Sequence, residues 1–238
     1  MGDVARRGSV ERLRATFREH GLAGLGYRVL DALQLYRRLV IVEIPLAPSP
    51  PRPLADASRV GVRRLERTDD DLRRYAELRP DQPPAEVRAR LDAGVECFLA
   101  LHGGVLASSL WAVRRHAHIH YLGCDLDVGP EAGYAFDAFT AAAHRGLDLN
   151  SWCSELMRRS MAAAGCRRLF GLQLPENRSA MTLSPRRAHA FLGVAHVLGP
   201  GPLRRVILAP ARAGALPPDF VLRPCRHIAM NGNRWHSF

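Results

Sequence analysis

The fold is decided by residues 133–194, which read GYAFDAFTAAAHRGLDLNSWCSELMRRSMAAAGCRRLFGLQLPENRSAMTLSPRRAHAFLGV. A strand pattern over Gly133–Thr140 leads through a turn into a strongly periodic helix over residues 149–164. A second strand, Arg168–Leu174, follows, and a short helix is predicted to end within residues 191–194. A turn from a strand into a helix offers backbone N–H groups and the positive helix end to an anionic phosphate. The order therefore favours a fold that holds a phosphate-bearing ligand, such as a carrier-linked acyl thioester.

The segments before this stretch predict further strands and helices. His102-Gly103-Gly104 between two apolar runs is a strong hairpin signal, and Gly129-Pro130 indicates a turn. Together they predict an α/β (α+β) fold with a mixed, mostly antiparallel sheet and helices on both faces. The expected elements are a strand at Val60–Leu65, helices at Asp69–Leu78 and Pro84–Ala93, strands at Cys97–Leu101 and Val105–Val113, and an extended segment at His116–Leu126.

Four regions follow one another along the chain. Residues 1–44 are predicted to form a helical arm, with apolar positions spaced for helix over residues 9–40. Residues 45–58 are rich in proline and read as an extended linker. The main domain is predicted at residues 59–210, followed by a C-terminal extension over residues 211–238. The arm is basic and amphipathic, but most such helices pack on their own domain, so binding to a membrane surface is not expected.

The composition limits the classes of partner. The formal net charge is +11, and all 34 basic residues are arginine, so the chain attracts nucleotide phosphates, acidic proteins, anionic lipid and nucleic acid alike. No helix-turn-helix, zinc-finger or aromatic RNA-binding signature accompanies the charge, so nucleic acid is not expected as a partner. The five cysteines form no C-x-x-C pair, which is typical of reduced thiols in a cytoplasmic protein. No signal peptide or membrane span is expected.

Three histidines alternate along one predicted strand, at His116, His118 and His120. Three imidazoles on one strand face could bind zinc with an open position. Neighbouring positions on one face lie about 7 Å apart, too far for all three to reach one ion. No metal is therefore expected, and His118 or His120 is predicted to take part in acceptor recognition or proton relay.

The span from Val60 to Leu208 resembles the GNAT superfamily of N-acyltransferases. In that family two neighbouring parallel strands splay apart and admit the pantetheine arm of an acyl thioester, and the turn after the first strand binds the coenzyme A pyrophosphate. Here Arg145 and Gly146 fit the pattern of that turn. The resemblance implies that the co-substrate is bound by the end of the first splayed strand, the turn and the loop after the second splayed strand, namely Phe139, Thr140, Arg145, Gly146, Leu147, Asp148, Leu149, Asn150 and Asn177.

The turn also departs from the family pattern, because Asp148 and Asn150 stand where small residues are usual. A carboxylate at a helix N-terminus is stabilised by the helix dipole and would repel a bound diphosphate at the same place. Two interpretations remain open. Either Asp148 caps the helix and the phosphate binds beside it, or the donor is an acidic acyl-carrier protein with a single phosphodiester.

Candidate acids and bases come from the resemblance and from acid–base chemistry. His189, four positions before Gly193, stands where the family commonly has a tyrosine that protonates the leaving thiolate, and an imidazole is a suitable acid for that step. Amine acceptors must lose a proton before attack, and Asp137, Glu131 and His118 are the candidate bases. Asn177 would hydrogen-bond the pantetheine arm or cap the local turn. The alternatives are a solvated or ion-paired Asp137, a structural His189 and an Asn177 that is a plain loop residue.

The function that the resemblance implies is transfer of an acyl group from a pantetheine thioester to an amine by direct attack. The donor would be acetyl-CoA, a longer acyl-CoA or an acyl-carrier protein, and the acceptor a small-molecule or peptide amine. A catalytically silent module that binds acyl thioesters is the alternative, favoured by Asp148 and Asn150 in the phosphate turn. The oligomeric state is left open, a homodimer included.

Overall fold

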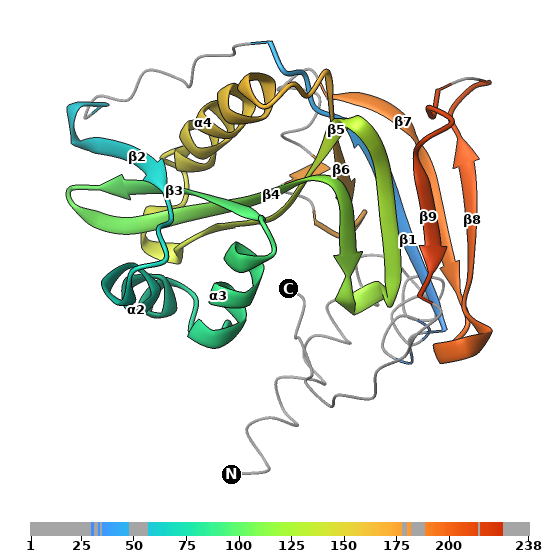
Figure 1. The fold of residues 1–238 in the computed structure, drawn as a ribbon, viewed down its shortest axis with the longest axis horizontal. Helices are drawn as coiled ribbons and strands as arrows, with labels where there is room; N and C mark the ends of the chain where they lie inside the picture. Colours follow the sequence, from blue (N-terminus) through green and yellow to red (C-terminus); the bar gives the residue numbers. More distant parts are fainter. Residues whose placement is uncertain are drawn as a thin grey trace, which may run out of the picture.

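A computed structural model describes residues 30, 33, 35–47, 57–177, 180–181, 189–213 and 215–225. One twisted sheet organises this part of the chain, in the order β2-β3-β4-β5-β6-β1-β7-β8, with β9 paired to β5 (Figure 1). All strand pairs are antiparallel except β5 with β6. The strands are β1 Tyr36–Glu43, β2 Val60–Arg64, β3 Glu96–His102, β4 Val105–Ile119, β5 Cys124–Thr140, β6 Arg168–Gln173, β7 Ala190–Leu198, β8 Arg205–Pro210 and β9 Val221–Pro224.

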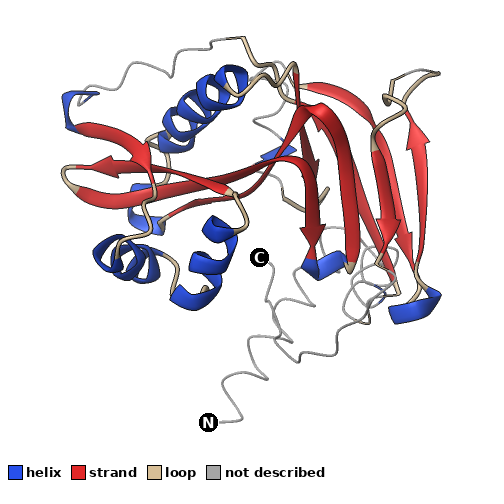
Figure 2. Ribbon diagram, in the orientation of Figure 1, coloured by secondary structure: helices blue, strands red, loops and turns tan. Residues whose placement is uncertain are grey.

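Three α-helices of the described residues cover the two faces of this sheet. Helices α2 (Asp69–Leu78) and α3 (Pro84–Asp92) lie on one face, and α4 (Leu149–Ala163) lies on the other (Figures 1 and 2). Helix α2 begins where the Thr68 hydroxyl accepts a hydrogen bond from the Asp71 amide. Helix α4 buries an apolar face against β3, β4 and β5, with Cys153, Met157 and Met161 in the core.

The second half of the sheet curves around its own apolar core. Strand β1 lies between β6 and β7, and β9 pairs with β5 and also contacts β8 (Figure 1). Strand β8 forms one edge of the sheet. Strand β9 contacts β8 and pairs with β5, so it partly closes the space between these two strands. Fully buried side chains such as Leu39, Ile41 and Phe170 fill the space inside. β1 and β9 join the sheet from outside the predicted 59–210 range.

The predicted fold class is confirmed. Among the described residues the sheet is mixed and mostly antiparallel, helices cover both faces, and one parallel pair, β5 with β6, stands in the middle of it. The predicted hairpin is present as well, because Gly103 and Gly104 both have positive φ and join β3 to β4. Helix α4 ends before Gly165, as its sequence predicts.

Three local predictions are wrong. Residues 36–40 belong to β1 and not to the predicted helix over residues 9–40, most of whose remaining residues lie outside the described part of the chain. Gly129-Pro130 forms no turn but lies inside β5, at a shift in the register between β4 and β5. Residues 190–194 are extended in β7, where a Cβ on Gly193 would overlap the Ala209 carbonyl oxygen of β8. Gly193 thus serves a close approach of two strands rather than a helix end.

In the described part of the chain, no helix combines the length and apolar character that crossing a membrane requires.

Candidate functional site

The parallel strands β5 and β6 part from each other partway along their length. They are paired over four rungs, from Ala132 with Arg168 to Ala135 with Gly171. Beyond that point β5 stays with β4, where Phe139 lies opposite Ser109, while β6 stays with β1. The two strand ends therefore diverge and leave backbone groups that no longer face each other. We call this gap, between residues 136–140 of β5 and residues 172–173 of β6, the wedge.

The last paired rung joins the two small residues Ala135 and Gly171. A Cβ on Gly171 would come within 3.3 Å of Val42 Cγ2 and 3.5 Å of Ile44 Cδ1. The position is therefore already closely packed by side chains from β1 and the residue after it. The strands part at a point where neither of them projects a bulky side chain.

β5 changes its backbone geometry just after the strands part. Asp137 has a φ of 50°, a left-handed conformation uncommon for aspartate in a strand. The pairing of β5 with β4 also shifts its register between Ser109 and Trp111, opposite Phe139 and Phe136. β5 has one residue more than β4 at this point. The extra residue forms a β-bulge, and a bulge bends the strand that contains it.

The Asp137 carboxylate is held by three donors. Arg79 Nη1 lies 2.9 Å from Asp137 Oδ1, while Gln82 Nε2 and Arg90 Nη1 lie 2.6 and 3.2 Å from Oδ2. Arg79 is 6% exposed and also binds both carboxylate oxygens of Asp81. An anion with this many cationic and amide donors is stabilised as an ion pair.

A buried polar chain extends this network into the core. Trp111 Nε1 donates to the Tyr75 hydroxyl at 2.7 Å, and that hydroxyl donates to Gln82 Oε1 at 3.1 Å. Burial raises the pKa of Tyr75 well above its ordinary value, so its hydroxyl stays protonated and available as a donor. Asp137 is thus the end of a structural network, which supports its interpretation as an ion-paired carboxylate rather than a general base.

The turn before α4 lies at the open end of the wedge. Gly146 has a φ of 88°, and no hydrogen bond donated by the Gly146 or Leu147 amide is found among the described residues. The Arg145 Nε reaches back to the Thr140 carbonyl oxygen at 3.4 Å, so the turn is tied to the end of β5. Unbonded amides, an exposed arginine and a helix N-terminus are the kinds of group that bind anions in proteins.

Asp148 sits at the N-cap position of α4 but does not cap it. Its φ is 50°, and its carboxylate makes no cap hydrogen bond to a backbone amide. Instead Asp148 Oδ2 accepts a hydrogen bond from the Ser151 hydroxyl at 2.7 Å. The first of the two open interpretations, a capping Asp148, is therefore wrong in its geometry. A negative charge remains at the helix end, where it disfavours a diphosphate more than a single phosphodiester.

Two polar atoms in the first turn of α4 are buried without a protein partner in the described part of the chain. They are Asn150 Oδ1, an acceptor, and Trp152 Nε1, a donor. Buried polar atoms ordinarily find a partner, so this turn has hydrogen-bonding capacity that a ligand or water would satisfy. Leu149, between Asp148 and Asn150, is buried in the core and contributes only its backbone.

The end of β5 is fixed by Ser108 on β4. Ser108 Oγ donates to the Phe139 carbonyl oxygen at 2.7 Å and lies 3.0 Å from Thr140 Oγ1. The Arg79 guanidinium lies 4.7 Å from the centre of the Phe139 ring. Phe139 and Thr140 therefore stay attached to β4 while β6 diverges from them.

The predicted site residue after β6 has a local structural role. Asn177 Oδ1 accepts a hydrogen bond from the Ala180 amide at 3.1 Å, and its carbonyl oxygen accepts one from Met181 at 3.0 Å. This is the pattern of an N-cap residue. The Asn177 side chain therefore caps the local turn, which is one of the two roles predicted for it.

Three candidate acid–base residues lie away from the wedge. His189 directly precedes β7, and because β1 lies between β7 and β6, it is about 10 Å from β6 by strand spacing. Glu131 lies four residues before Ala135, about 13 Å along β5, is exposed, and pairs with Arg167 at 3.4 Å. His118 lies opposite Asp125, far down the β4–β5 hairpin. The structure thus does not gather them at one point.

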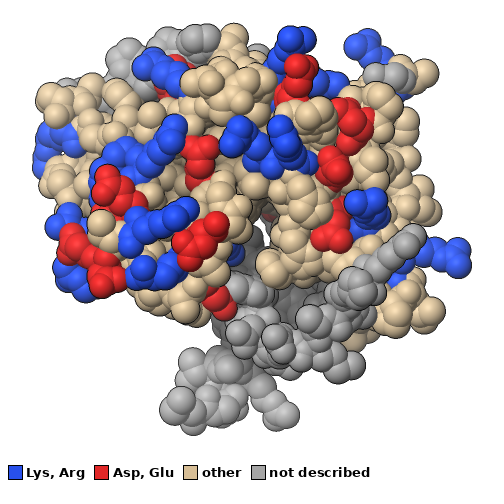
Figure 3. Space-filling view, viewed as in Figure 1, with Lys and Arg blue, Asp and Glu red and all other residues tan. Residues whose placement is uncertain are grey.

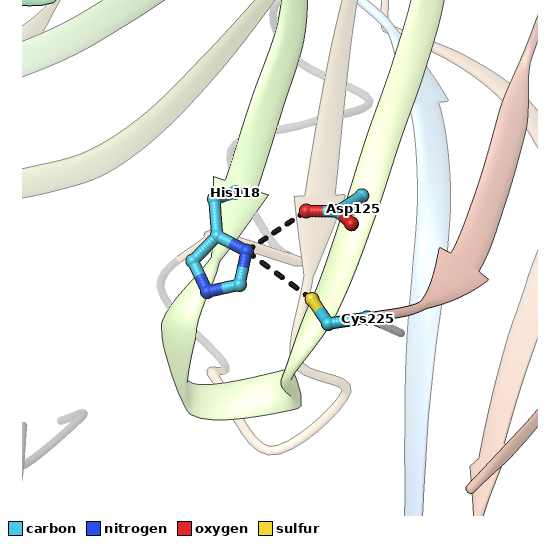
Figure 4. A group of neighbouring side chains, drawn as sticks. All are labelled: His118, Asp125 and Cys225. Carbon is cyan, nitrogen blue, oxygen red and sulfur yellow. Dashed lines mark hydrogen bonds and ion pairs between the residues drawn. The ribbon is translucent and has the colours of Figure 1, made fainter. Parts of the chain in front are cut away.

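A cluster that the sequence analysis missed surrounds His118. His118 Nδ1 lies 2.9 Å from Asp125 Oδ1 and 3.3 Å from Cys225 Sγ (Figure 4). Burial first, and then the neighbouring Asp125, raise the pKa of the Cys225 thiol to about 12. Cys225 is therefore not an activated nucleophile. The alternation of histidines pointed to this strand, but Asp125 and Cys225 carry no local signal.

A surface pocket of about 390 Å³ lies outside all of these groups. It is formed by the segments around the end of β2 and the start of β3 and contains no predicted site residue. The surface itself carries arginines interspersed with acidic side chains on the face shown in Figure 3, rather than one continuous basic patch. The pocket is lined by Arg64, Leu65, Glu66, Arg67, Leu91, Gly94, Val95, Glu96 and Cys97.

No family model and no curated protein matches the sequence. Solved structures do match. A conserved protein of unknown function from Staphylococcus epidermidis shares 11% identity at a TM-score of 0.46; the match covers 71% of this chain and 64%, less than two thirds, of that protein. The aminoglycoside N-acetyltransferase AAC(6')-Iy in complex with CoA shares 20% identity at a TM-score of 0.43, covering 54% of this chain and 86% of that one.

A third match is an aminoglycoside acetyltransferase from an uncultured soil metagenomic sample in complex with sisomicin. It shares 11% identity at a TM-score of 0.44, and the match covers 55% of this chain and 88% of that one. The structural matches thus include N-acetyltransferases. Identities and TM-scores of this size assign no function, so the site is judged by its own geometry.

Proposed function

We propose that this protein transfers an acyl group from a pantetheine thioester to an amine. The observation that carries the proposal is the wedge, where β5 and β6 part after Ala135 and Gly171 and the α4 N-terminus stands at the open end. A slender pantetheine arm suits a gap between two strand ends, since both expose backbone groups that can bond its amides. The Gly146 and Leu147 amides, with Arg145, would bind the phosphate at its end.

The reaction would proceed by direct attack. The lone pair of a neutral amine attacks the thioester carbonyl carbon, and the C–N bond forms as the carbonyl oxygen takes the negative charge. A backbone N–H of the diverging part of β5 would stabilise that oxyanion. Collapse breaks the C–S bond, the thiolate leaves and takes up a proton, and the nitrogen loses one. Water at the open end of the wedge is proposed to supply the proton to the thiolate and to take the proton from the nitrogen, because His189 and Glu131 lie away from the wedge.

The donor is proposed to be either an acyl-CoA or an acyl-carrier protein. The Asp148 carboxylate at the α4 N-terminus favours a ligand with one phosphodiester, which a carrier protein presents. The interspersed charges on the visible face do not form a single basic docking surface. Steady-state rates with acetyl-CoA, longer acyl-CoAs and acyl-carrier protein at equal concentrations would distinguish the donors.

A silent binding module is the second candidate function. It is favoured by the Asp137 carboxylate, which is committed to Arg79, Arg90 and Gln82 and so does not serve as a base. Under this alternative the wedge binds an acyl thioester without turnover.

One experiment separates the two. The protein is incubated with acetyl-CoA or acyl-carrier protein and a panel of amino acids, peptides and aminoglycosides, and released thiol is followed together with the mass of each acceptor. Acylated acceptor at a rate above the protein-free control supports the transferase. Saturable binding of acetyl-CoA or of acyl-carrier protein by calorimetry, without acylated product, supports the binding module. Absence of both binding and product with either donor overturns the wedge as a site.

A further inference from the structure

A second site lies on the β4–β5 hairpin, away from the wedge. His118 comes from β4, Asp125 from β5, and Cys225 directly follows β9 (Figure 4). One ligand atom from each residue lies within 4.8 Å of the other two. Asp125 follows His118 by 7 positions in the sequence, whereas Cys225 follows it by 107.

The strand ladders hold the three residues in place. His118 lies directly opposite Asp125 in the β4–β5 register. On the other edge of β5, Cys124 pairs with Pro224, and the Cys225 amide donates to the Gly123 carbonyl oxygen at 3.1 Å. The backbone of all three residues is thus fixed by hydrogen bonds on both sides of β5. A cluster held in this way needs little reordering to bind a ligand.

The geometry excludes a Cys-His-Asp relay. A relay needs the thiol on one imidazole nitrogen and the carboxylate on the other. Here Asp125 Oδ1 and Cys225 Sγ both approach the same atom, His118 Nδ1, at 2.9 and 3.3 Å. One ring nitrogen carries either one proton or one lone pair, so it cannot serve both groups fully. A ring nitrogen, a carboxylate oxygen and a sulfur that lie within 4.8 Å of one another are instead arranged like the ligands of a cation.

The spacing suits a zinc-type ion. Bond lengths of about 2.0–2.3 Å in a tetrahedral site place pairs of ligand atoms roughly 3.3–3.8 Å apart. The observed distances of 2.9 and 3.3 Å need to grow by only a few tenths of an ångström. A nitrogen, a carboxylate oxygen and a thiolate sulfur are all ligands that zinc accepts. His120, whose ring centre lies 4.3 Å from that of His118, offers a further nitrogen close by.

We propose that His118, Asp125 and Cys225 bind one divalent zinc-type ion, with a fourth position taken by water or His120. The ion displaces the thiol proton of Cys225 to solvent and bonds the thiolate. Because Cys225 follows β9, the ion ties the end of β9 to the β4–β5 hairpin. The site is independent of the proposed acyl transfer, and its role is to fasten the strand that bridges β5 and β8.

Cobalt titration tests the site directly. The full chain is stripped with a chelator and titrated with Co²⁺, and the thiolate-to-cobalt charge-transfer band is recorded; Zn²⁺ is then added in competition. We expect one ion per chain, a band that Zn²⁺ abolishes, and binding at least about 100-fold weaker in Cys225→Ser and Asp125→Asn. His116→Ala, a change on the same strand outside the cluster, should bind like the unaltered protein. A missing band, or equal affinity in Cys225→Ser, overturns the proposal.

A second measurement needs no variant. Cys97, Cys124, Cys153 and Cys166 are buried, while Cys225 is half-exposed. Alkylation of the folded protein should therefore modify Cys225 first, as peptide mass mapping would show. Saturating Zn²⁺ is expected to slow the labelling of Cys225 at least about tenfold, because the ion occupies the sulfur lone pairs. A labelling rate that Zn²⁺ leaves unchanged contradicts the site even if the variants misfold.

Discussion

At the scale of single residues, Asp137 shows how a carboxylate in a strand becomes a structural anchor. Its bulge turns it toward Arg79, which is 6% exposed and would lose a partner if the charge were removed. Breaking a fully buried ion pair costs about 3–5 kcal/mol, and the 23% exposure of the Asp137 side chain reduces that cost.

Asp137→Asn is expected to lower the free energy of unfolding by about 1–3 kcal/mol, as measured by urea denaturation. Asp70→Asn is the matched control, because Asp70 forms only exposed ion pairs with Arg73 and Arg74, each worth under about 1 kcal/mol. Unchanged stability in Asp137→Asn, together with lost acyl transfer, would contradict the anchor role and restore Asp137 as a base.

Arg145 makes the clearest prediction at the phosphate turn. Arg145→Ala removes an exposed positive charge from the α4 N-terminus without touching the core. Affinity for CoA, measured by calorimetry, is expected to fall about tenfold, which corresponds to one charge-assisted hydrogen bond of about 1.4 kcal/mol. Arg205→Ala, an exposed arginine on β8, should leave the affinity unchanged. Equal affinities in both variants would remove the phosphate site from this turn.

Some residues of the candidate sites can be predicted from the sequence, and others cannot. The Arg145-Gly146 turn was predictable, because a strand, a glycine and a periodic helix follow one another within a few residues. The partners of Asp137 were not, since Arg79 and Arg90 lie 58 and 47 positions away. The contact of Cys225 with His118 could not be predicted for the same reason, because the two residues are separated by 107 positions. Contacts made by folding across the sheet leave no local pattern.

At the scale of elements, α2 is fastened to β2 by a charged pair. Asp71 is 7% exposed and accepts hydrogen bonds from both Arg63 Nη atoms and from the Glu66 amide. The Arg63 hydrogen bonds hold the pKa of the Asp71 carboxyl below its ordinary value of 3.8. The contribution to stability is therefore complete above pH 3.8 and is lost as the pH falls through the lower, folded value.

Thermal unfolding between pH 7 and pH 2 tests this pair. The melting temperature should fall more steeply below the ordinary Asp pKa of 3.8 in the unaltered protein than in Asp71→Asn, which has no carboxyl to titrate. Asp69→Asn, whose carboxyl is 95% exposed, is the control and should follow the unaltered protein. Parallel curves for Asp71→Asn and the unaltered protein would show that this pair contributes nothing.

Strand β7 makes a prediction about close packing. A Cβ on Gly193 would overlap the Ala209 carbonyl oxygen, and both groups are backbone-fixed in the β7–β8 pair. Gly193→Ala is expected to cost about 1–3 kcal/mol of unfolding free energy in urea denaturation. Gly61→Ala in β2, where the new Cβ would meet only Leu101 Cβ at 4.0 Å, should cost nothing. Equal stability of the two variants would contradict the observed approach of β8 to β7.

Elements differed in how well the sequence predicted them. α2 has a side-chain cap, α3 begins with a proline and is followed by Gly94, and α4 has strong periodicity, so all three are predicted within a residue or two. The sequence predicts a helix end at the short run Ala190-Phe191-Leu192-Gly193-Val194, although a short apolar run of this kind suits a strand equally. The predicted helix over residues 9–40 includes residues 36–40 of β1, because their strand pattern continues an apolar, arginine-rich segment.

At the scale of the whole molecule, the chain brings two distant segments into one sheet. β1 comes from the predicted N-terminal arm and lies between β6 and β7, and β9 comes from the predicted C-terminal extension and pairs with β5. The parallel pair at the centre was implied by the resemblance of the sequence to the GNAT superfamily, and the structure contains it. The strands that complete the sheet were not predicted, because their partners lie far apart in the chain.

Hydrogen–deuterium exchange with and without saturating acetyl-CoA tests the central claim most directly. If the wedge grips a pantetheine arm, exchange should slow in residues 136–147, at the end of β5 and the turn, and in residues 172–177, after the last paired rung with β6. The β4–β5 hairpin around His118 serves as an internal control and should exchange at the same rate. Protection confined to any other part of the protein, or to none, would contradict the wedge as the acyl-thioester site.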